Sequence, residues 1–261
     1  MASNQSRGGK ELSGRTALIT GAGSGLGRET AVLMASRGAR VIVCDRDAAG
    51  IAETLTELGA GHSGVQADVS DEQSILSAVR DVDRIDILVT SAGVAEGAGD
   101  TVTRSLDHWQ RIIDVNLSGT FFAARTVAPI MKANGGGVIL TLSSIAGVIG
   151  LPRRAAYSAS KAAVTMLTRT LASEWGPWGI RVNAVAPGYI RTPMTDELIS
   201  AGRLDATAVL RRTPAGRMGT PQDVAAVLAY LASDEAAFIS GAVLPVDGGY
   251  MAYGAPEDIN V

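Results

Sequence analysis

The chain has 261 residues and a formal net charge of −3, with 46% hydrophobic and 19% charged residues. This balance supplies enough apolar side chains for a large core and excludes a disordered chain. The slight acidic excess, without any basic patch, gives no electrostatic reason to expect nucleic acid as a partner. The single cysteine, Cys44, excludes an internal disulfide, and neither His62 nor His108 has metal-ligand spacing with it, so we expect no metal site.

The start of the chain, Met1–Lys10, is polar and rich in glycine and serine, without the apolar stretch of a signal peptide. No segment reaches the roughly 18 uninterrupted apolar residues that a membrane helix needs. We therefore expect a soluble, cytoplasmic protein with no membrane partner.

Short β-branched runs alternate with helix-length amphipathic segments, which is typical of βαβ units and a parallel sheet. The predicted strands, in chain order, are Thr16–Thr20, Val41–Asp45, Gly64–Ala67, Ile85–Thr90, Gly137–Leu142, Ile180–Ala186 and Ala242–Val246. The predicted helices lie near Gly27–Arg37, Ala48–Leu58, Asp71–Val82, Ser105–Lys132, Tyr157–Trp175 and Pro221–Ser233. Because the interior strands are nearly continuous apolar runs, both faces of the sheet should be covered. The pattern predicts an α/β fold: a doubly wound, seven-stranded parallel sheet with helices on both faces.

A glycine-rich turn joins the first predicted strand to the first predicted helix, in the sequence Thr20-Gly21-Ala22-Gly23-Ser24-Gly25-Leu26-Gly27. Glycines at such a turn permit positive φ, close approach of a pyrophosphate and tight packing of helix on strand. Phosphates placed there meet free N–H groups at the positive end of the helix dipole. Because a strand precedes the turn and a helix follows it, the turn indicates a dinucleotide-binding Rossmann fold.

The second predicted strand ends in Asp45, 18 residues after Gly27. A carboxylate at this point accepts hydrogen bonds from the adenosine ribose hydroxyls and repels a 2′-phosphate, so it favours NAD. Arg46 follows directly and could instead bind a 2′-phosphate, so NADP stays possible.

Tyr157 and Lys161 lie one turn apart at the start of a predicted helix, so they share a face. That face continues with Val164, Leu171 and Trp175, which should pack inward. Burying an ammonium is costly, whereas a cation beside a phenol favours phenolate by lowering its pKa. The pair is a candidate acid–base, although a lysine extending to solvent from a helix N-terminus has the same spacing.

The fifth predicted strand ends in Leu142-Ser143-Ser144, thirteen residues before the tyrosine. Carboxyl ends of parallel strands line the ligand crevice of such sheets. A hydroxyl there can hold a substrate oxygen and stabilise developing negative charge, and either serine could also be a turn former.

From Leu12 to Gly249 the chain resembles the short-chain dehydrogenase/reductase family in its compact, single-domain form. The family's glycine motif is met by Thr20, Gly21, Gly25 and Gly27, and its tyrosine motif by Tyr157 and Lys161. The resemblance implies four catalytic residues: Asn116, Ser144, Tyr157 and Lys161. It implies that Tyr157 exchanges the hydroxyl proton while hydride passes to or from nicotinamide. Ser144 positions the substrate oxygen, Lys161 lowers the phenol pKa and holds the ribose, and Asn116 supports a water relay.

The resemblance also implies a set of cofactor-binding residues that overlaps the catalytic set. These are Gly21, Ser24, Gly25, Leu26, Gly27, Asp45, Asp68, Val69, Ala92, Gly93, Tyr157, Lys161, Pro187, Gly188, Ile190 and Thr192. One stretch departs from the family: its usual Asn-Asn-Ala-Gly is Thr90-Ser91-Ala92-Gly93 here, which keeps only the Ala-Gly. Family members that use NADP often have a basic residue where this chain has Ser24, which agrees with Asp45 in favouring NAD.

We expect residues 12–250 to form a single Rossmann-fold catalytic domain, with 190–217 as a substrate lid, 1–11 as a flexible N-terminal tail and 251–261 as a C-terminal tail. The C-terminal tail is hypothesised to fold over its own or a neighbouring subunit's pocket. Substrate choice should lie in Ile145–Arg154, in the lid and around Val94–Asp100. Arg153 and Arg154 are candidates for contact with an anionic or polyhydroxylated substrate, or are solvated arginines on a loop rim.

The sequence thus predicts an NAD-dependent oxidoreductase that interconverts a small secondary alcohol, such as a sugar or polyol, and its carbonyl. An NADP-dependent carbonyl or 3-ketoacyl reductase is the alternative. The intact catalytic set argues against a nucleotide-binding regulatory protein without catalysis. About 70 residues after Pro187 are too few for the substrate domain of a sugar-nucleotide epimerase or dehydratase. By resemblance we expect a homotetramer, with Ser105–Lys132 and Tyr157–Trp175 at one two-fold interface.

Overall fold

A seven-stranded, wholly parallel sheet forms the centre of the computed structural model, which describes residues 11–97 and 99–254 apart from the side chains of Pro193 and Met194. Its strand order is β3-β2-β1-β4-β5-β6-β7. The strands are β1 (Thr16–Thr20), β2 (Arg40–Asp45), β3 (Ser63–Gln66), β4 (Ile87–Thr90), β5 (Gly137–Leu142), β6 (Ile180–Pro187) and β7 (Val243–Val246). The predicted α/β, doubly wound fold is confirmed.

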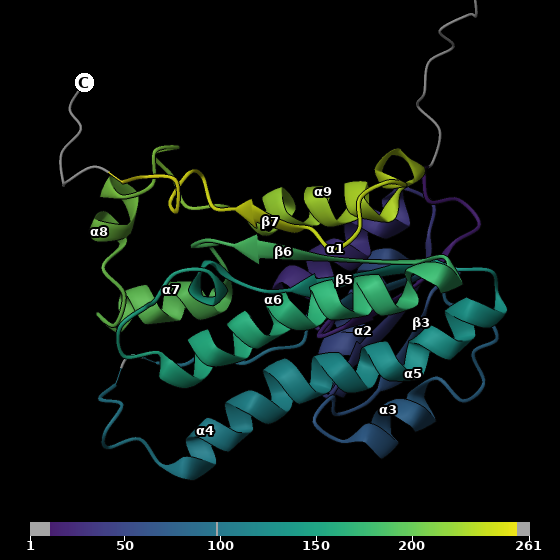
Figure 1. Cartoon of the computed structure of the whole chain (residues 1–261), viewed down its shortest axis with the longest axis horizontal. Helices are drawn as coiled ribbons and strands as arrows, with labels where there is room; N and C mark the ends of the chain where they lie inside the picture. Colours follow the sequence, from purple (N-terminus) through teal and green to yellow (C-terminus); the bar gives the residue numbers. More distant parts are fainter. Residues whose placement is uncertain (1–10, 98, 255–261) are drawn as a thin grey trace, which may run out of the picture.

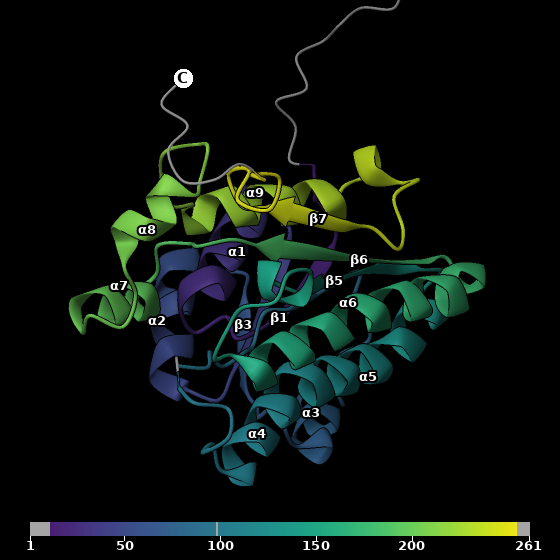
Figure 2. The ribbon, with the colours of Figure 1, turned by 60° about the vertical axis from the view of Figure 1, so that its left-hand side comes forward.

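Helices cover both faces of the sheet (Figures 1 and 2). They are α1 (Gly25–Ser36), α2 (Ala48–Leu58), α3 (Glu72–Ala78), α4 (Leu106–Ile113), α5 (Gly119–Ala133), α6 (Ala155–Trp175), α7 (Pro193–Ser200), α8 (Ala206–Arg211) and α9 (Pro221–Ala232). Alternate strand residues enter opposite cores because side chains of a strand alternate between its faces. Ile19 packs in the core that includes α1 and α9, whereas Leu18 packs in the core that includes α3, α5 and α6.

The strand order reverses between β1 and β4, which are hydrogen-bonded neighbours. Helices that follow the two strands leave to opposite faces at such a switch point, which opens a crevice beyond the carboxyl ends of the strands. The residues that follow β1, β2, β4, β5 and β6 therefore meet at one edge, and this edge carries the site described below.

The predicted helix Ser105–Lys132 is interrupted in the structure. A five-residue π-helical segment, Asp114–Ser118, lies between α4 and α5. Such a bulge inserts extra backbone into a helix and is frequently found at functional sites. It carries Asn116, whose side chain bonds both backbone groups of Val94, with its Oδ1 accepting from the amide at 2.8 Å and its Nδ2 donating to the carbonyl at 3.1 Å.

The predicted lid contains two helices, α7 and α8, that the sequence does not predict. Each begins at a side-chain cap, Thr192 for α7 and Asp205 for α8. The base of the lid is tied by a parallel bridge between Ile190 and Gly219, with Arg191 N donating to the Gly219 carbonyl at 2.8 Å. Figure 1 shows α7 and α8 together beyond one end of the sheet. The predicted tail, 251–261, is described only as far as Gly254, so most of the segment to which the hypothesis of a folded-over tail applies, 255–261, lies outside the described residues.

No helix within the described residues is long and apolar enough to cross a lipid bilayer.

Candidate active site

The glycine-rich turn is held in a conformation that larger residues would disrupt. Gly21 has φ of 69°, and a Cβ on it would lie 2.6 Å from the backbone of Ala92, at the end of the neighbouring strand. The N-cap residue of α1, Ser24, provides no side-chain cap, whereas Asp47 caps the next helix, α2. The N–H groups of the first turn of α1 are therefore left for a ligand, which is the arrangement that binds phosphate.

Asp45 lies directly beside this turn. Its Oδ2 accepts a hydrogen bond from Gly23 N at 2.8 Å, and its Oδ1 accepts one from Asp47 N at 3.0 Å. The hydrogen bonds of Ser70 lower the pKa of Asp68, and the positive charge of Arg46 lowers it further. Arg46 thus lies near the Asp68 carboxylate, whereas the carboxylate of Asp45 is fixed at the turn.

A cavity of about 470 Å³ runs from the glycine turn to the start of α6. The predicted residues that line it are Gly21, Ser24, Gly25, Leu26, Gly27, Asp45, Asp68, Val69, Ala92, Gly93, Ser144, Arg154, Tyr157, Lys161, Pro187, Gly188, Ile190 and Thr192. Two predicted residues do not line it: Asn116 is fully buried behind the wall, and Arg153 is exposed outside. An uncapped helix start, a carboxylate beside it and a tyrosine–lysine pair along one cavity fit an extended dinucleotide.

At the inner end of the cavity, Lys161 is buried and Tyr157 is half-buried. The Lys161 ammonium donates to the Leu142 carbonyl at 2.7 Å and lies 5.8 Å from the centre of the tyrosine ring. Burial lowers the pKa of Lys161 to about 8. Burial also raises the pKa of Tyr157, opposed by a hydrogen bond with Ser144 and by the positive charge of Arg154.

The expected lowering of the phenol pKa by Lys161 stays a prediction. The ammonium is directed at a backbone carbonyl, and the groups that lower the pKa of Tyr157 are Ser144 and Arg154. The sequence could place the lysine on the same helix face as the phenol, but could not show which oxygen it bonds.

The two serines after β5 have different surroundings. The Ser143 hydroxyl bonds the Lys161 carbonyl at 3.1 Å and the Thr165 hydroxyl at 2.7 Å, so it fastens α6 to the strand. The Ser144 side chain accepts from Ala146 N at 3.1 Å and hydrogen-bonds Tyr157, and it lines the cavity. The geometry thus gives the position beside the phenol to Ser144.

Asn116 is linked to the helix of the tyrosine through Ser160. Its Nδ2 lies 3.3 Å from the Ser160 hydroxyl, which itself donates to the Tyr157 carbonyl at 2.8 Å. A Cβ on Gly93 would lie 3.3 Å from Asn116 Oδ1 and 3.8 Å from the Lys161 ammonium. Asn116 therefore supports the wall of the cavity at the point where the predicted catalytic groups converge.

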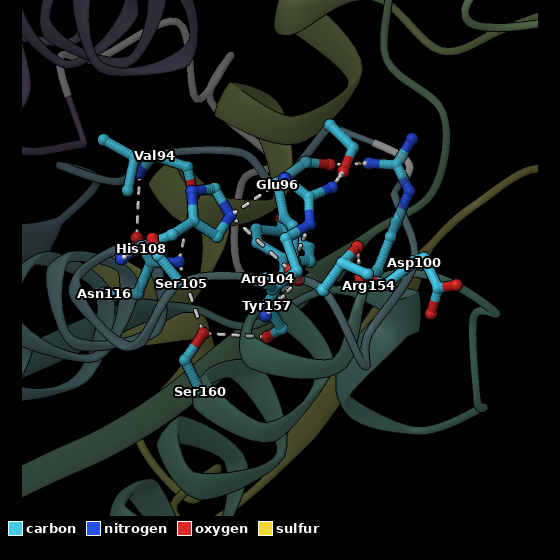
Figure 3. A network of polar contacts seen from close by, with 12 residues as sticks. Val94, Glu96, Asp100, Arg104, Ser105, His108, Asn116, Arg154, Tyr157 and Ser160 are labelled. Atoms are coloured by element: carbon cyan, nitrogen blue, oxygen red, sulfur yellow. Dashed lines mark hydrogen bonds and ion pairs between the residues drawn. The ribbon is translucent and has the colours of Figure 1, made fainter.

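Sequence reasoning missed Glu96, the buried acid of this region. Its side chain is 3% exposed, and its Oε2 accepts from Tyr157 N at 2.9 Å. Its Oε1 lies 3.9 Å from Arg104 Nε and 3.6 Å from His108 Nε2. Figure 3 shows both basic side chains directed at this carboxylate. The acid stands in the predicted substrate segment Val94–Asp100, but no spacing rule marks a loop residue as the cap of a helix that begins sixty residues later.

The outer end of the cavity is lined by side chains from the lid and its neighbours. Leu151, Leu198 and Leu204 supply apolar surface, and Tyr189 supplies a phenol. The ring of Tyr189 lies 5.4 Å from that of Tyr250, over which the Arg212 guanidinium lies at 4.8 Å. This end of the cavity is therefore of mixed polarity.

Comparison with known proteins agrees with the geometry. A family model described as enoyl-(acyl carrier protein) reductase matches residues 21–251. The chain belongs to the short-chain dehydrogenase/reductase family and is an NAD(P)-dependent oxidoreductase of alcohols and ketones.

Three similar proteins show the range of the family. A galactitol 2-dehydrogenase (L-tagatose-forming) from Cereibacter sphaeroides is 42% identical over 92% of this chain and 96% of its own length. A solved structure of a candidate 2-deoxy-D-gluconate 3-dehydrogenase from Agrobacterium tumefaciens, with NADP bound, is 38% identical with a TM-score of 0.87, over 94% of this chain and all of its own. An uncharacterized short-chain dehydrogenase/reductase of Sinorhizobium fredii is 39% identical over 93% of this chain, which spans only 45% of its length.

Proposed function

We propose that the cavity converts a small secondary alcohol to its ketone, or the reverse, with Tyr157 as the acid–base. The observation that carries the proposal is the meeting of Ser144, Tyr157 and Lys161 at one end of a cavity whose other end is an uncapped helix start. Bound nicotinamide supplies the hydride acceptor or donor. In the oxidation direction, Tyr157 removes the hydroxyl proton while Ser144 holds the substrate oxygen.

The other residues act on these groups. Burial lowers the pKa of Lys161 to about 8, so it can give up or regain a proton close to neutral pH. Lys161 is also proposed to hold the nicotinamide ribose. Asn116 holds the wall behind the site and supports the relay of protons to solvent. Positioned proton transfer of this kind contributes about 10²–10⁴-fold to rate.

We infer a preference for NAD over NADP. The Asp45 carboxylate accepts from the backbone N–H groups of Gly23 and Asp47 and lines the cavity, and this position supports a contact with ribose hydroxyls and repulsion of a 2′-phosphate. Gly21, Ser24, Gly25, Leu26 and Gly27 are proposed to hold the pyrophosphate. The remaining predicted cofactor contacts line the same cavity: Asp68, Val69, Ala92, Gly93, Pro187, Gly188, Ile190 and Thr192.

We propose that residues 12–250 act as one catalytic domain, that 190–217 closes over the substrate, and that the enzyme is a cytoplasmic homotetramer. Apolar side chains remain exposed on the helices predicted at a two-fold interface: Trp109 is 41%, Phe121 36% and Met166 56% exposed. Burial of such side chains against a second copy would remove apolar surface from water.

The proposed function is tested by incubating the purified enzyme with neutral polyols, sugars, hydroxy acids and secondary alcohols, each with NAD and with NADP. Formation of the reduced cofactor, followed by its absorbance, identifies substrates. We expect turnover with at least one secondary alcohol and a higher kcat/KM for NAD. Failure of every alcohol and of the matching ketones, with a folded protein that binds NADH, would contradict the proposal.

A further inference from the structure

Arg154 is the basic residue that distinguishes the substrate end of the cavity. It lines the cavity as the N-cap residue of α6, three residues before Tyr157. One helical turn rises about 5.4 Å, so its Cα lies within roughly one turn of the proposed acid–base. The positive charge of Arg154 acts on both phenols of the cavity. It lowers the pKa of Tyr157 and of Tyr189, whereas burial raises both pKa values.

The guanidinium is held in place by a backbone group and not by an acid. Its Nη1 donates to the Glu96 carbonyl at 2.8 Å, and Figure 3 shows the Arg154 side chain running alongside this loop. Over residues 11–97 and 99–254, no carboxylate lies within ion-pair distance of it. A guanidinium has five N–H donors in a fixed fork, so most of its donors are left for another partner.

The nearest buried acid is already neutralised by other groups. The Glu96 carboxylate faces Arg104 and His108 and accepts from Tyr157 N. Because Glu96 also caps the N-terminus of α6, it satisfies the end of that helix as well. The net charge that faces the substrate end from this network is therefore the single positive charge of Arg154.

A second cation, Arg212, also acts on the phenol of Tyr189. Arg212 lies over the Tyr250 ring, and its charge also lowers the pKa of Tyr189, whose hydroxyl hydrogen-bonds Tyr250. Tyr189 thus lies in the field of Arg154 and of Arg212. Leu198 and Leu204 supply apolar surface to the cavity that Arg154 lines. This is a lining for a carbon skeleton that ends in an anion.

We propose that the substrate is a hydroxy acid, whose carboxylate pairs with Arg154 while its carbinol lies against Ser144 and Tyr157. A carboxylate matches one half-buried guanidinium in charge and can bind it through two parallel hydrogen bonds. A phosphate dianion would bring a second negative charge to a site with a single inner cation. This inference rests on the proposed function of the same site and adds the class of substrate.

The test compares each hydroxy acid with its uncharged amide, for example gluconate with gluconamide and lactate with lactamide. Wild-type kcat/KM should favour the acid of the best pair by about 10-fold or more, since hydrogen bonds between a guanidinium and a carboxylate are stronger than those with a neutral amide. Arg154→Met should abolish this preference, so that kcat/KM falls about 10-fold or more further for the acid than for the amide, whereas any slowing that acts through the pKa of Tyr157 affects both compounds and leaves their ratio unchanged. Arg153→Met, at the exposed neighbouring position, should leave the preference unchanged.

A structural role alone would give a different result, in which Arg154→Met slows acid and amide equally. That result, or equal wild-type rates for acid and amide, overturns the inference and leaves the proposed function standing. Calorimetric titration of the enzyme–NADH complex with each acid decides the case in which no compound turns over. Binding of an acid that Arg154→Met abolishes supports the inference although the proposed function fails, and absence of acid binding overturns the inference.

Discussion

Replacing Glu96 by glutamine or alanine separates its negative charge from its role as a hydrogen-bond acceptor. In the wild type, Tyr157 N lies 2.9 Å from Glu96 Oε2. Glutamine keeps an oxygen that can accept from Tyr157 N, but it loses the charge that faces Arg104 and His108. Alanine removes both, and leaves a buried N–H at the start of α6 without its acceptor.

The loss of folding stability expected for each variant follows from the burial of the side chains involved. Glu96 is 3% exposed, whereas the side chains of Arg104 and His108 are 26% and 30% exposed and can be partly rehydrated. Breaking a fully buried pair costs about 3–5 kcal/mol, so partial rehydration should bring the glutamine variant to about 1–2 kcal/mol. Loss of a hydrogen-bond acceptor and of packed volume should bring the alanine variant to about 3–4 kcal/mol.

Thermal unfolding of the enzyme at one fixed protein concentration checks these values. A change of 1 kcal/mol corresponds to a shift in Tm of about 2–4 °C for chains of this size. Glu96→Gln should thus lower Tm by about 2–8 °C and Glu96→Ala by more. Glu57→Gln, at an exposed position of α2, is the control and should stay within about 0.5 kcal/mol of wild type. A Tm for Glu96→Ala equal to that of the control would refute the assigned role of the buried carboxylate.

Three further predictions concern the lysine, the glycine turn and the cofactor. Burial lowers the pKa of Lys161 from 10.5 to about 8, so the unfolded chain binds more protons between these values and the contribution of Lys161 to stability rises with pH across that window. Lys161→Met should therefore be inactive, yet its free energy of unfolding in urea at pH 7 should exceed that of wild type by about 1–3 kcal/mol. This difference should shrink towards pH 10. A variant less stable than wild type at pH 7 would count against a costly buried ammonium. Gly21→Ala should lower the free energy of unfolding by about 1–3 kcal/mol and weaken NADH binding in a fluorescence titration, because its Cβ meets the Ala92 backbone. Gly14→Ala is the control: Gly14 has φ of 76° and open space around it, so this change should leave NADH binding unchanged. Asp45→Ser should raise the ratio of kcat/KM for NADP to that for NAD by about 10-fold or more, since it removes a negative charge beside the 2′-phosphate position, and an unchanged ratio would contradict the placement of Asp45.

The elements of the sheet could be predicted because their signals are local. β1 and β5 match their predicted bounds, and the apolar runs of the interior strands indicate that both faces of the sheet are buried. The π-helical segment Asp114–Ser118 could not be predicted, since it depends on the bonds of Asn116 to Val94 across the fold. The short helices of the lid were missed because propensity in six to eight residues is weak, and their caps, Thr192 and Asp205, look like ordinary loop residues.

The candidate site divides in the same way. Groups defined by spacing along one element, such as Tyr157 with Lys161, are brought to the cavity as the spacing predicts. Contacts between distant segments could not be predicted from the sequence. Two examples are the hydrogen bond of Glu96 to the start of α6 and that of Lys161 to the Leu142 carbonyl. The adjacent arginines show the limit most directly, because sequence treats them alike whereas the structure puts only Arg154 on the cavity wall.

The most direct test of the central claim is a paired measurement on Tyr157→Phe, which removes the hydroxyl and keeps the ring. NADH affinity by equilibrium titration should stay within about threefold of wild type, while turnover of the best alcohol found in the screen should fall by about 10²-fold or more. Retention of a tenth of the wild-type rate, with NADH bound normally, would contradict the role of this phenol as the acid–base.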